Sequence, residues 1–276
     1  MTRASAIQMC SSLSIDDNLK SAGHLLRVAA DQGARLAVLP EMFPIISTNA
    51  QDKIKYQEDV GSGKIQNFLQ TQAQTLNLWI VGGTMPLRSA QGNRVRAASL
   101  VYDANGAVAA RYDKLHLFDV DLENKESHRE SANTEPGDHL VVVDTPIGKL
   151  GLSVCYDLRF PAMFNYLFHQ GAEIFAIPSA FTVPTGSAHW HLLTRARAVE
   201  NFSYVMGACQ GGTHESGRQT YGHSLIVDPW GTIIAEQQEN QPGVITADID
   251  LDFLRKIRAS IPIEKHHRII PDISQI

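Results

Sequence analysis

The stretch GLSVCYDLRFP, residues 151–161, joins a strand-like run to a short polar turn and the start of a helix. Apolar and small residues alternate up to Val154, which is typical of a β-strand. Pro161 suits the first turn of a helix because its fixed φ fits there. Cys155 is therefore expected near the carboxyl end of a strand, where open α/β sheets bind ligands and free backbone N–H groups can stabilise an oxyanion. The alternative is a small buried hydrophobe, the commoner role of a lone cysteine.

The composition favours one large α/β domain. The chain has 276 residues, of which 43% are hydrophobic and 19% are charged, enough for a sizeable core. We expect a single domain over residues 1–276, with residues 261–276 as a C-terminal tail. The formal net charge of −5 and the lack of basic runs interleaved with aromatic residues argue against a nucleic-acid partner.

The sequence also predicts a cytoplasmic protein without a membrane partner. No stretch approaches the roughly 20 apolar residues needed to cross a bilayer, and the N-terminus lacks the apolar region of a signal peptide. The three cysteines, Cys10, Cys155 and Cys209, are far apart and form no CxxC pair. This pattern indicates reduced thiols rather than a disulfide framework or a zinc site.

Strands and helices alternate along the chain. A strand at residues 4–9, a helix capped by Ser14 and ended at Gly33, and a strand at residues 36–39 form a parallel βαβ unit. This unit places Glu41 at the carboxyl edge of a sheet. A hairpin around Asn105-Gly106 then places Lys114 directly after its second strand.

The second half continues the alternation, and residues 119–138 between the halves are predicted to be a long loop. Helices are expected at 161–170, at 187–200 opened by Ser187, and from 250; strands are expected at 174–177, 204–208, 224–227, 232–235 and 244–249. The mixture of βαβ units and hairpins predicts an α/β fold, a four-layer α-β-β-α sandwich with two mixed sheets stacked between helical layers.

Glu41 and Lys114 supply what a catalytic cysteine lacks. A thiol with an ordinary pKa of about 8.5 is mostly protonated at neutral pH, so it needs a base or a neighbouring cation. Glu41 is a candidate general base for Cys155. Lys114, together with the backbone N–H of Tyr156, is a candidate for stabilising an oxyanion. Taken separately, Glu41 and Lys114 also fit ordinary exposed charges.

Three segments resemble the signature segments of the nitrilase, or carbon-nitrogen hydrolase, superfamily: VLPEMF at 38–43, YDKLHLFDV at 112–120 and GLSVCYDLRFP. Their order and spacing match as well, and the resemblance extends over nearly the whole chain. It implies that Glu41, Lys114 and Cys155 are the catalytic glutamate, lysine and cysteine. The family carries a second glutamate after the lysine, which maps onto Glu130, with Glu135 as the alternative.

Within the superfamily, residues 178–201 and 221–231 are most similar to the deaminated glutathione amidase branch. The resemblance implies hydrolysis of the amide between an α-ketoglutarate-like acyl group and Cys-Gly, a metabolite-repair reaction that needs no cofactor. Arg159 and Thr185 are candidates for binding the anionic acyl group, although Arg159 equally fits a structural ion pair. The family also implies a homodimer or higher homo-oligomer.

Two other functions compete with this one. An omega-amidase or a carbamoylase of the same superfamily would use the same catalytic residues on a different substrate. A non-catalytic relative that binds a small molecule or serves in an assembly would keep the fold without an activated thiol.

Several further patterns are weak. His189 and His191 are two residues apart on a helix and point in different directions, so we expect no metal site there. His266 and His267 are expected at the surface. GSGK at 61–64 lacks the first glycine and the final Ser or Thr of a P-loop. GLSVC resembles the G-x-S-x-G elbow around Ser153, but it lacks the last glycine, and the sharp turn is not expected to tolerate Cys155.

Overall fold

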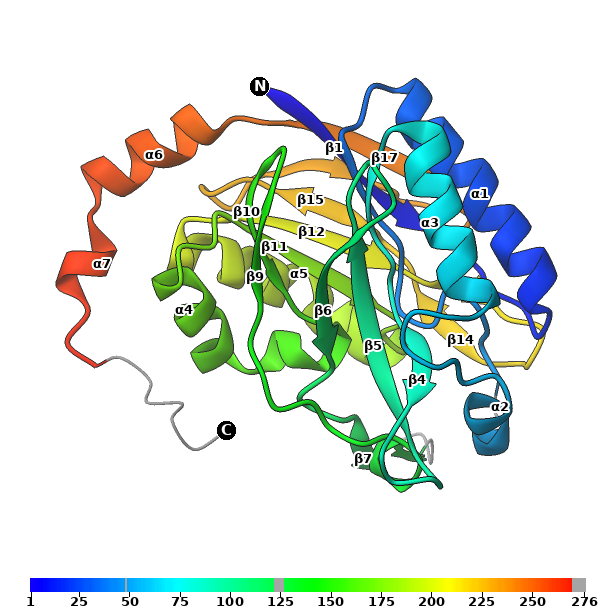
Figure 1. Cartoon of the computed structure of the whole chain (residues 1–276). Helices are drawn as coiled ribbons and strands as arrows, with labels where there is room; N and C mark the ends of the chain where they lie inside the picture. The colour runs from blue at the N-terminus through cyan, green and yellow to red at the C-terminus, as the bar shows by residue number, and fades with distance from the viewer. Residues whose placement is uncertain (48, 122–126, 270–276) are drawn as a thin grey trace.

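Two β-sheets lie face to face in the centre of the molecule, with helices on both outer sides (Figure 1). The structure is a computed structural model and describes residues 1–47, 49–121 and 127–269. Strands β1 and β12, one from each sheet, are in contact, which places the sheets against each other. The α-β-β-α sandwich predicted from the alternation of elements is therefore confirmed.

The first sheet has the strand order β17-β1-β2-β3-β5-β4, and β6 also pairs with β5. Strands β1, β2 and β3 are parallel, and the others are antiparallel to their neighbours. The strands are β1 (Thr2–Gln8), β2 (Leu36–Val38), β3 (Trp79–Val81), β4 (Met85–Arg88), β5 (Val95–Tyr102), β6 (Val108–Asp113) and β17 (Gly243–Ile249).

The second sheet has the order β16-β15-β12-β11-β10-β9, with β10, β11 and β12 parallel. Its strands are β9 (Val142–Thr145), β10 (Gly148–Leu152), β11 (Ile174–Ser179), β12 (Tyr204–Cys209), β15 (Leu225–Val227) and β16 (Ile233–Glu236). Two small hairpins lie outside the sheets: β7 (Asp119–Asp121) with β8 (Ser127–Arg129), and β13 (Gly211–Thr213) with β14 (Gln219–Tyr221).

The central strands are buried on both faces, and their side chains alternate between two cores. In β2, Leu36 and Val38 belong to the core cluster shared with the second sheet, whereas Ala37 belongs to the cluster beneath the helices of the first sheet. This arrangement explains why the sequence of β2 is a continuous apolar run rather than an alternation.

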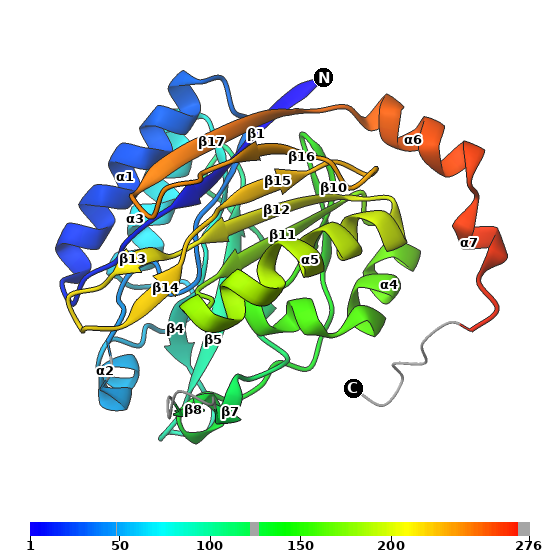
Figure 2. The ribbon, with the colours of Figure 1, turned by 180° about the vertical axis from the view of Figure 1, so that it is seen from behind.

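The helices form the outer layers (Figure 2). Helices α1 (Ile15–Asp31) and α3 (Lys64–Leu76) cover the first sheet, and α4 (Pro161–His169) and α5 (Val183–Asn201) cover the second. The remaining helical elements are α2 (Ala50–Lys55), α6 (Leu251–Ser260), α7 (Ile263–His266) and the 3₁₀ turns η1 (Glu130–Ala132) and η2 (Cys155–Arg159). As predicted, Ser14 caps α1 and accepts a hydrogen bond from the Asp17 N–H.

Two predicted elements differ from the structure. Helix α5 starts four residues before Ser187, because the Thr182 side chain caps it and Pro184 fits its first turn. The segment 119–138 is not a featureless loop, since β7, β8 and η1 lie within it, although its residues 122–126 are outside the described part. Polar contacts stabilise this segment, including hydrogen bonds from Ser131 to Asp119. Because the contacts are polar, apolar periodicity did not predict β7, β8 or η1.

The segment after residue 260 packs partly on the core. Ile263 contacts the core cluster, and His267 is half-buried, with its Nδ1 2.8 Å from Nε2 of His169. The surface position expected for His266 is found, but that expected for His267 is wrong. No helix among the described residues is both long and apolar enough to cross a membrane.

Candidate active site

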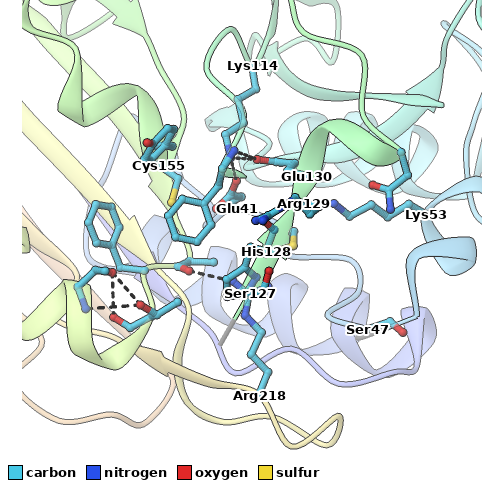
Figure 3. A pocket seen from close by; sticks show the side chains of 18 of the residues that line it. Glu41, Ser47, Lys53, Lys114, Ser127, His128, Arg129, Glu130, Cys155 and Arg218 are labelled. Atoms are coloured by element: carbon cyan, nitrogen blue, oxygen red, sulfur yellow. Dashed lines mark hydrogen bonds and ion pairs between the residues drawn. The ribbon is translucent and has the colours of Figure 1, made fainter. Parts of the chain in front are cut away.

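A cavity of about 610 Å³ opens at the carboxyl ends of the parallel strands. Glu41, Lys114, Glu130 and Cys155 all line it (Figure 3). Glu41 follows β2 of the first sheet, and Cys155 follows β10 of the second. The stacking of the two sheets therefore brings together residues that are 114 positions apart in the sequence.

The backbone around Glu41 is fixed by close packing and by hydrogen bonds. A Cβ on Gly83, whose φ is +55°, would lie 2.1 Å from the Pro40 carbonyl oxygen, so only glycine permits this approach. Met42 has a φ of 55°, and its N–H donates to Oγ1 of Thr84 at 2.8 Å. The side-chain amide of Gln210 donates to the Glu41 carbonyl oxygen. The carboxylate of Glu41 is thus held in one place at the cavity wall.

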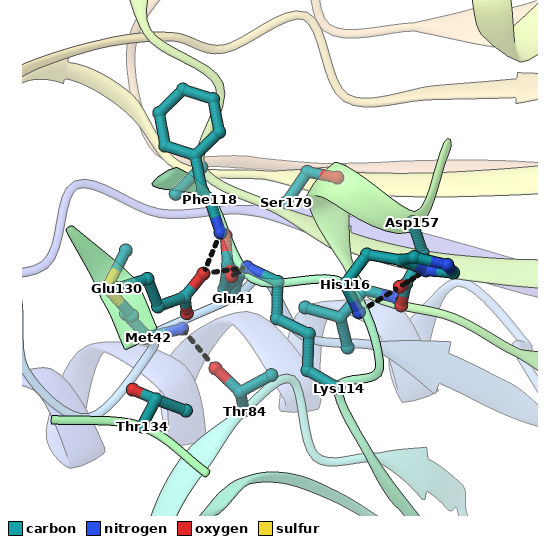
Figure 4. A network of polar contacts seen from close by, with 12 residues as sticks. Glu41, Met42, Thr84, Lys114, His116, Phe118, Glu130, Thr134, Asp157 and Ser179 are labelled. Carbon is teal, nitrogen blue, oxygen red and sulfur yellow. Dashed lines mark hydrogen bonds and ion pairs between the residues drawn. The ribbon is translucent and has the colours of Figure 1, made fainter. Parts of the chain in front are cut away.

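The Lys114 ammonium lies between two carboxylates (Figure 4). Its Nζ donates to Oε1 of Glu41 at 2.7 Å and to Oε2 of Glu130 at 2.8 Å, and its side chain is only 2% exposed. Burial alone would lower the pKa of Lys114, but the charges of Glu130 and Glu41 raise it well above its ordinary value. An ammonium has three N–H donors, so one remains for a ligand in the cavity.

Glu130 and Glu135 occupy different environments. Glu130 accepts from Lys114 and from the Phe118 N–H at 2.8 Å. Burial would raise the pKa of Glu130, but the charges of Lys114 and Lys53 and these hydrogen bonds lower it, so the carboxylate is ionised. Glu135 instead forms an ion pair with Arg96 and a hydrogen bond with Ser89, outside the cavity lining. The geometry therefore favours Glu130 as the second glutamate of the site.

Cys155 begins the η2 turn with a φ of 49°. The surrounding structure holds Cys155 in the left-handed region, so a sharp turn does occur at this residue, but it is not an elbow around Ser153. Ser153 is buried, donates a hydrogen bond to the Ala176 carbonyl oxygen and is not among the residues that line the cavity. Burial raises the pKa of the Cys155 thiol well above its ordinary value, and Glu41 raises it further, against an opposing effect of Lys114. The resting thiol is therefore protonated.

Buried Asp157 ties the cysteine turn to the lysine segment. Its carboxylate accepts from the Val154 N–H, from the Tyr112 hydroxyl and from the His116 N–H, and Nδ1 of His116 lies 2.7 Å away. Tyr112 and His116 flank Lys114 on either side in the sequence. One carboxylate therefore fixes the position of Lys114 relative to Cys155.

Tyr156, Arg159 and Thr185, the three residues predicted to contact substrate, also line the cavity. The guanidinium carbon of Arg159 lies 5.9 Å from the ring centre of Tyr156 and 5.7 Å from that of Phe181. Its Nη2 is 3.2 Å from Nδ1 of His189, and it forms no ion pair with Asp157, which bonds elsewhere. Thr185 lies in the first turn of α5, where its hydroxyl is 2.8 Å from that of Thr182.

The structure adds three cations that sequence reasoning missed, Lys53, Arg129 and Arg218. Lys53 extends from α2, and Arg218 comes from the loop between β13 and β14 (Figure 3). Burial lowers the pKa of Lys53, partly offset by the charge of Glu130. Nη2 of Arg218 donates to the Ala180 carbonyl oxygen, and its buried Nε has no hydrogen-bond partner among the described residues. The only sequence signal for Lys53 was a short polar helix, and that for Arg218 was the turn residues Ser216-Gly217.

A thiol, a carboxylate and a buried ammonium meet at one cavity at the edge of an α-β-β-α sandwich, an arrangement that can activate a thiol for nucleophilic attack. The sequence pattern of the carbon-nitrogen hydrolase family matches residues 3–259. The deaminated glutathione amidase of Yersinia enterocolitica is 38% identical over 269 residues, covering 97% of this chain and 93% of that protein. The chain therefore belongs to the carbon-nitrogen hydrolase family.

Two solved structures share the fold. The C. elegans NitFhit protein superposes with a TM-score of 0.89 at 34% identity, covering 97% of this chain; the present chain spans 65% of the length of that one. Saccharomyces cerevisiae Nit3, described as a member of branch 10 of the nitrilase superfamily, has a TM-score of 0.87 at 31% identity and 97% coverage of both chains. These likenesses confirm the family predicted from the three sequence segments.

Replacing the buried ammonium tests its importance for stability. In Lys114→Met, Glu41 and Glu130 become unpaired buried carboxylates, and we expect the free energy of unfolding at pH 7.5 to fall by about 3–5 kcal/mol. Without the ammonium, burial raises the pKa of Glu130 in the folded state, so the variant should regain part of the lost stability as the pH falls towards 5. In the parent, Glu130 has a lowered pKa, and its contribution is lost only as the pH falls through that value.

Urea unfolding at pH 7.5 and pH 5 measures both effects. Lys149→Met, which removes an exposed lysine, is the matched control and should change little at either pH. An equal loss of stability by Lys114→Met at the two pH values would contradict the assignment of an ionised Glu130 beside Lys114.

Proposed function

We propose that this chain is an amidase that hydrolyses deaminated glutathione to 2-oxoglutarate and Cys-Gly through a cysteine thioester. The observation that carries the reaction class is the position of Glu41, Lys114 and Cys155 around one cavity. The substrate rests on the relative named deaminated glutathione amidase and on the cationic lining described below. No cofactor takes part in the proposed reaction.

In the first half-reaction, Glu41 takes the proton of the Cys155 thiol as the sulfur attacks the amide carbonyl carbon. A general base is required because the thiol is protonated at rest. The negative charge on the carbonyl oxygen is stabilised by the remaining N–H of Lys114 and by a backbone N–H of the η2 turn, which we assign to Tyr156. The tetrahedral intermediate then collapses as Glu41 returns the proton to the leaving amine of Cys-Gly, and a thioester remains on Cys155.

In the second half-reaction, Glu41 takes a proton from water, which attacks the thioester carbonyl carbon. The same donors stabilise the second oxyanion, the carbon–sulfur bond breaks, and the proton returns to Cys155. Glu130 contacts Lys114 rather than the sulfur, so we propose that it positions the ammonium and keeps it charged. The carboxylic acid product leaves, and the resting state is restored.

Removing the nucleophile tests the mechanism. We expect Cys155→Ala to fold and to lose turnover of deaminated glutathione by about 10⁴-fold or more, while Cys10→Ala keeps its rate. Mass spectrometry of acid-quenched parent enzyme should find the acyl group on the peptide that contains Cys155. Full turnover by Cys155→Ala would show that the mechanism is wrong.

The same sample also separates the enzyme from a non-catalytic relative. Iodoacetamide should modify Cys155 faster than Cys10 or Cys209, because Cys155 lines the cavity beside Glu41, the proposed base. Equal rates at the three cysteines, together with no turnover, would favour a binding or assembly function instead.

The charge of the cavity matches a substrate with two carboxylates. Among the described lining residues, five are cationic and only Glu41 and Glu130 are acidic; the cations are Lys53, Lys114, Arg129, Arg159 and Arg218. Arg129 already pairs with Asp121. We propose that Arg159 and the Thr185 hydroxyl bind the carboxylate of the acyl group, and that Arg218 binds the glycine carboxylate of the leaving group.

Two substrates separate these roles and the rival activities. 2-Oxoglutaramate carries the same acyl group, but its leaving group is ammonia instead of Cys-Gly. Arg159→Gln should therefore reduce kcat/KM for both substrates, by about 10-fold or more, whereas Arg218→Gln should do so only for deaminated glutathione. Equal effects of Arg218→Gln on both would contradict its role. A parent enzyme with the higher kcat/KM on 2-oxoglutaramate would be an omega-amidase, and one with the higher value on an N-carbamoyl compound would be a carbamoylase.

We propose that a second copy of the chain covers the outer surface of α5, giving a homodimer or a higher homo-oligomer. Leu192 and Val199 on α5 and Trp230 in the neighbouring turn are 67%, 44% and 60% exposed, which is unusual for large apolar side chains on one surface. The molar mass in solution tests this proposal. Trp230→Ser combined with Leu192→Ser should lower it, and a monomeric parent would contradict it.

We also propose a cytoplasmic location. The described cysteines are free thiols, which is the usual state in a reducing compartment. Cell fractionation with antibody detection tests the location, and recovery mainly outside the cytoplasmic fraction would overturn it.

A further inference from the structure

Three metal-ligating side chains converge beside α5, outside the cavity. His191 lies on α5, His223 follows β14, and Glu236 ends β16. Their ligand atoms all lie within 4.8 Å of one another. None of the three lines the active-site cavity, and the proposed reaction does not use them.

The three side chains are already arranged around one point. Nε2 of His191 is 2.7 Å and Nδ1 of His223 is 2.9 Å from the same oxygen, Oε1 of Glu236. Four-coordinate zinc with bonds of about 2.0–2.1 Å spaces its ligand atoms about 3.3 Å apart. Movement of the side chains on the order of 1 Å would therefore admit an ion between them.

The protein backbone restrains this arrangement. His223 has a φ of 56°, and its carbonyl oxygen accepts a hydrogen bond from the indole N–H of buried Trp190. Its ring stacks on Tyr221, with centroids 4.4 Å apart. Helix α5 contacts both β14 and β15, and β15 pairs with β16 (Figure 2). His191 and Glu236 thus lie on packed elements, and His223 lies in the short segment between β14 and β15.

We propose that His191, His223 and Glu236 form a binding site for a divalent transition-metal ion such as Zn²⁺. Two imidazoles and one carboxylate suit borderline ions of this kind. The side chains are 33%, 24% and 18% exposed, so an ion has access from solvent, and three protein ligands leave a coordination position open to water. These features indicate an exchangeable ion rather than a permanent structural one.

This proposal departs from the sequence-based expectation of no metal site. The reason for separating His189 from His191 is consistent with the structure, because His189 contacts Arg159 while His191 contacts Glu236. His223 and Glu236, which complete the group, are 32 and 45 positions further along the chain, and no local pattern links them to His191. Helix α5 therefore carries both histidines, with His191 beside Glu236 at the proposed metal site and His189 beside Arg159 of the cavity lining.

Calorimetric titration of Zn²⁺ into chelator-treated protein tests the site. The background is Cys155→Ala, so that the active-site thiol contributes nothing. We expect one Zn²⁺ per chain, with binding weakened about 10- to 100-fold or more by either His191→Gln or Glu236→Gln. Visible absorption after addition of Co²⁺ should show a four- or five-coordinate ion in the background protein and not in these variants. Far-ultraviolet circular dichroism without metal confirms that each variant is folded.

His169→Gln is the matched control, because His169 and His267 form another adjacent imidazole pair among the described residues. It should leave Zn²⁺ affinity unchanged. The proposal is wrong if no stoichiometric binding occurs, if His191→Gln and Glu236→Gln both bind Zn²⁺ as the background does, or if only His169→Gln weakens binding. In those cases the three side chains form a hydrogen-bonded contact between α5 and β16 and nothing more.

Discussion

The buried ammonium of Lys114 constrains the site more than any other single group. A cation that is 2% exposed requires compensating charge, and the two carboxylates that provide it come from different parts of the chain. Glu41 follows β2, Lys114 follows β6, and Glu130 lies in η1 after β8. Pairing these charges fixes three connecting segments at one edge of the sandwich. Lys114 itself, the first residue after β6, is thereby held in the interior.

Other buried polar groups connect this arrangement to the turn that carries Cys155. Asp157 joins the residues flanking Lys114 to the turn that carries Cys155, and Gln210 joins the end of β12 to the backbone of Glu41. Met42 and Cys155 both adopt positive φ, a conformation that costs free energy for residues other than glycine. Such strain persists where hydrogen bonds and packing hold the backbone on both sides, and that is the situation of both residues here.

The sequence predicted the parts of this arrangement that local chemistry determines. The Ser14 cap, the hairpin around Asn105-Gly106 and the apolar runs of the parallel strands are confirmed, because each depends on neighbouring residues. Placing Glu41 and Cys155 at carboxyl ends followed from the βαβ connections. These connections did not show that Glu41 and Cys155, which come from different sheets, meet at one cavity. Only the resemblance to a family linked the two residues.

The cavity residues that sequence analysis missed depend instead on contacts between distant parts of the chain. Helix α2 and the β13–β14 hairpin are short and polar, and their positions depend on contacts far away in the sequence. Lys53 and Arg218, which these elements carry, were missed for that reason. The early start of α5 was a local error instead, because Thr182 and Pro184 already formed a cap and first turn. Residue patterns thus predict helices and strands that have an apolar face or a capping residue of their own. The cations that complete the cavity are placed by tertiary packing.

The charge arrangement also bears on the cost of the proposed chemistry. Because the pKa of the Cys155 thiol is raised and that of Lys114 is raised, the resting site holds its negative charge on Glu41 and Glu130 around one ammonium. Proton transfer to Glu41 moves a negative charge to sulfur and then to the carbonyl oxygen, all within reach of the same cation. The buried site therefore relocates charge without creating a new unpaired one, which would be costly in a low-dielectric interior. A neutral thiol with an adjacent base is therefore favoured over a permanent thiolate. The Lys114 ammonium donates to two carboxylates, and its third N–H remains to stabilise the transition state.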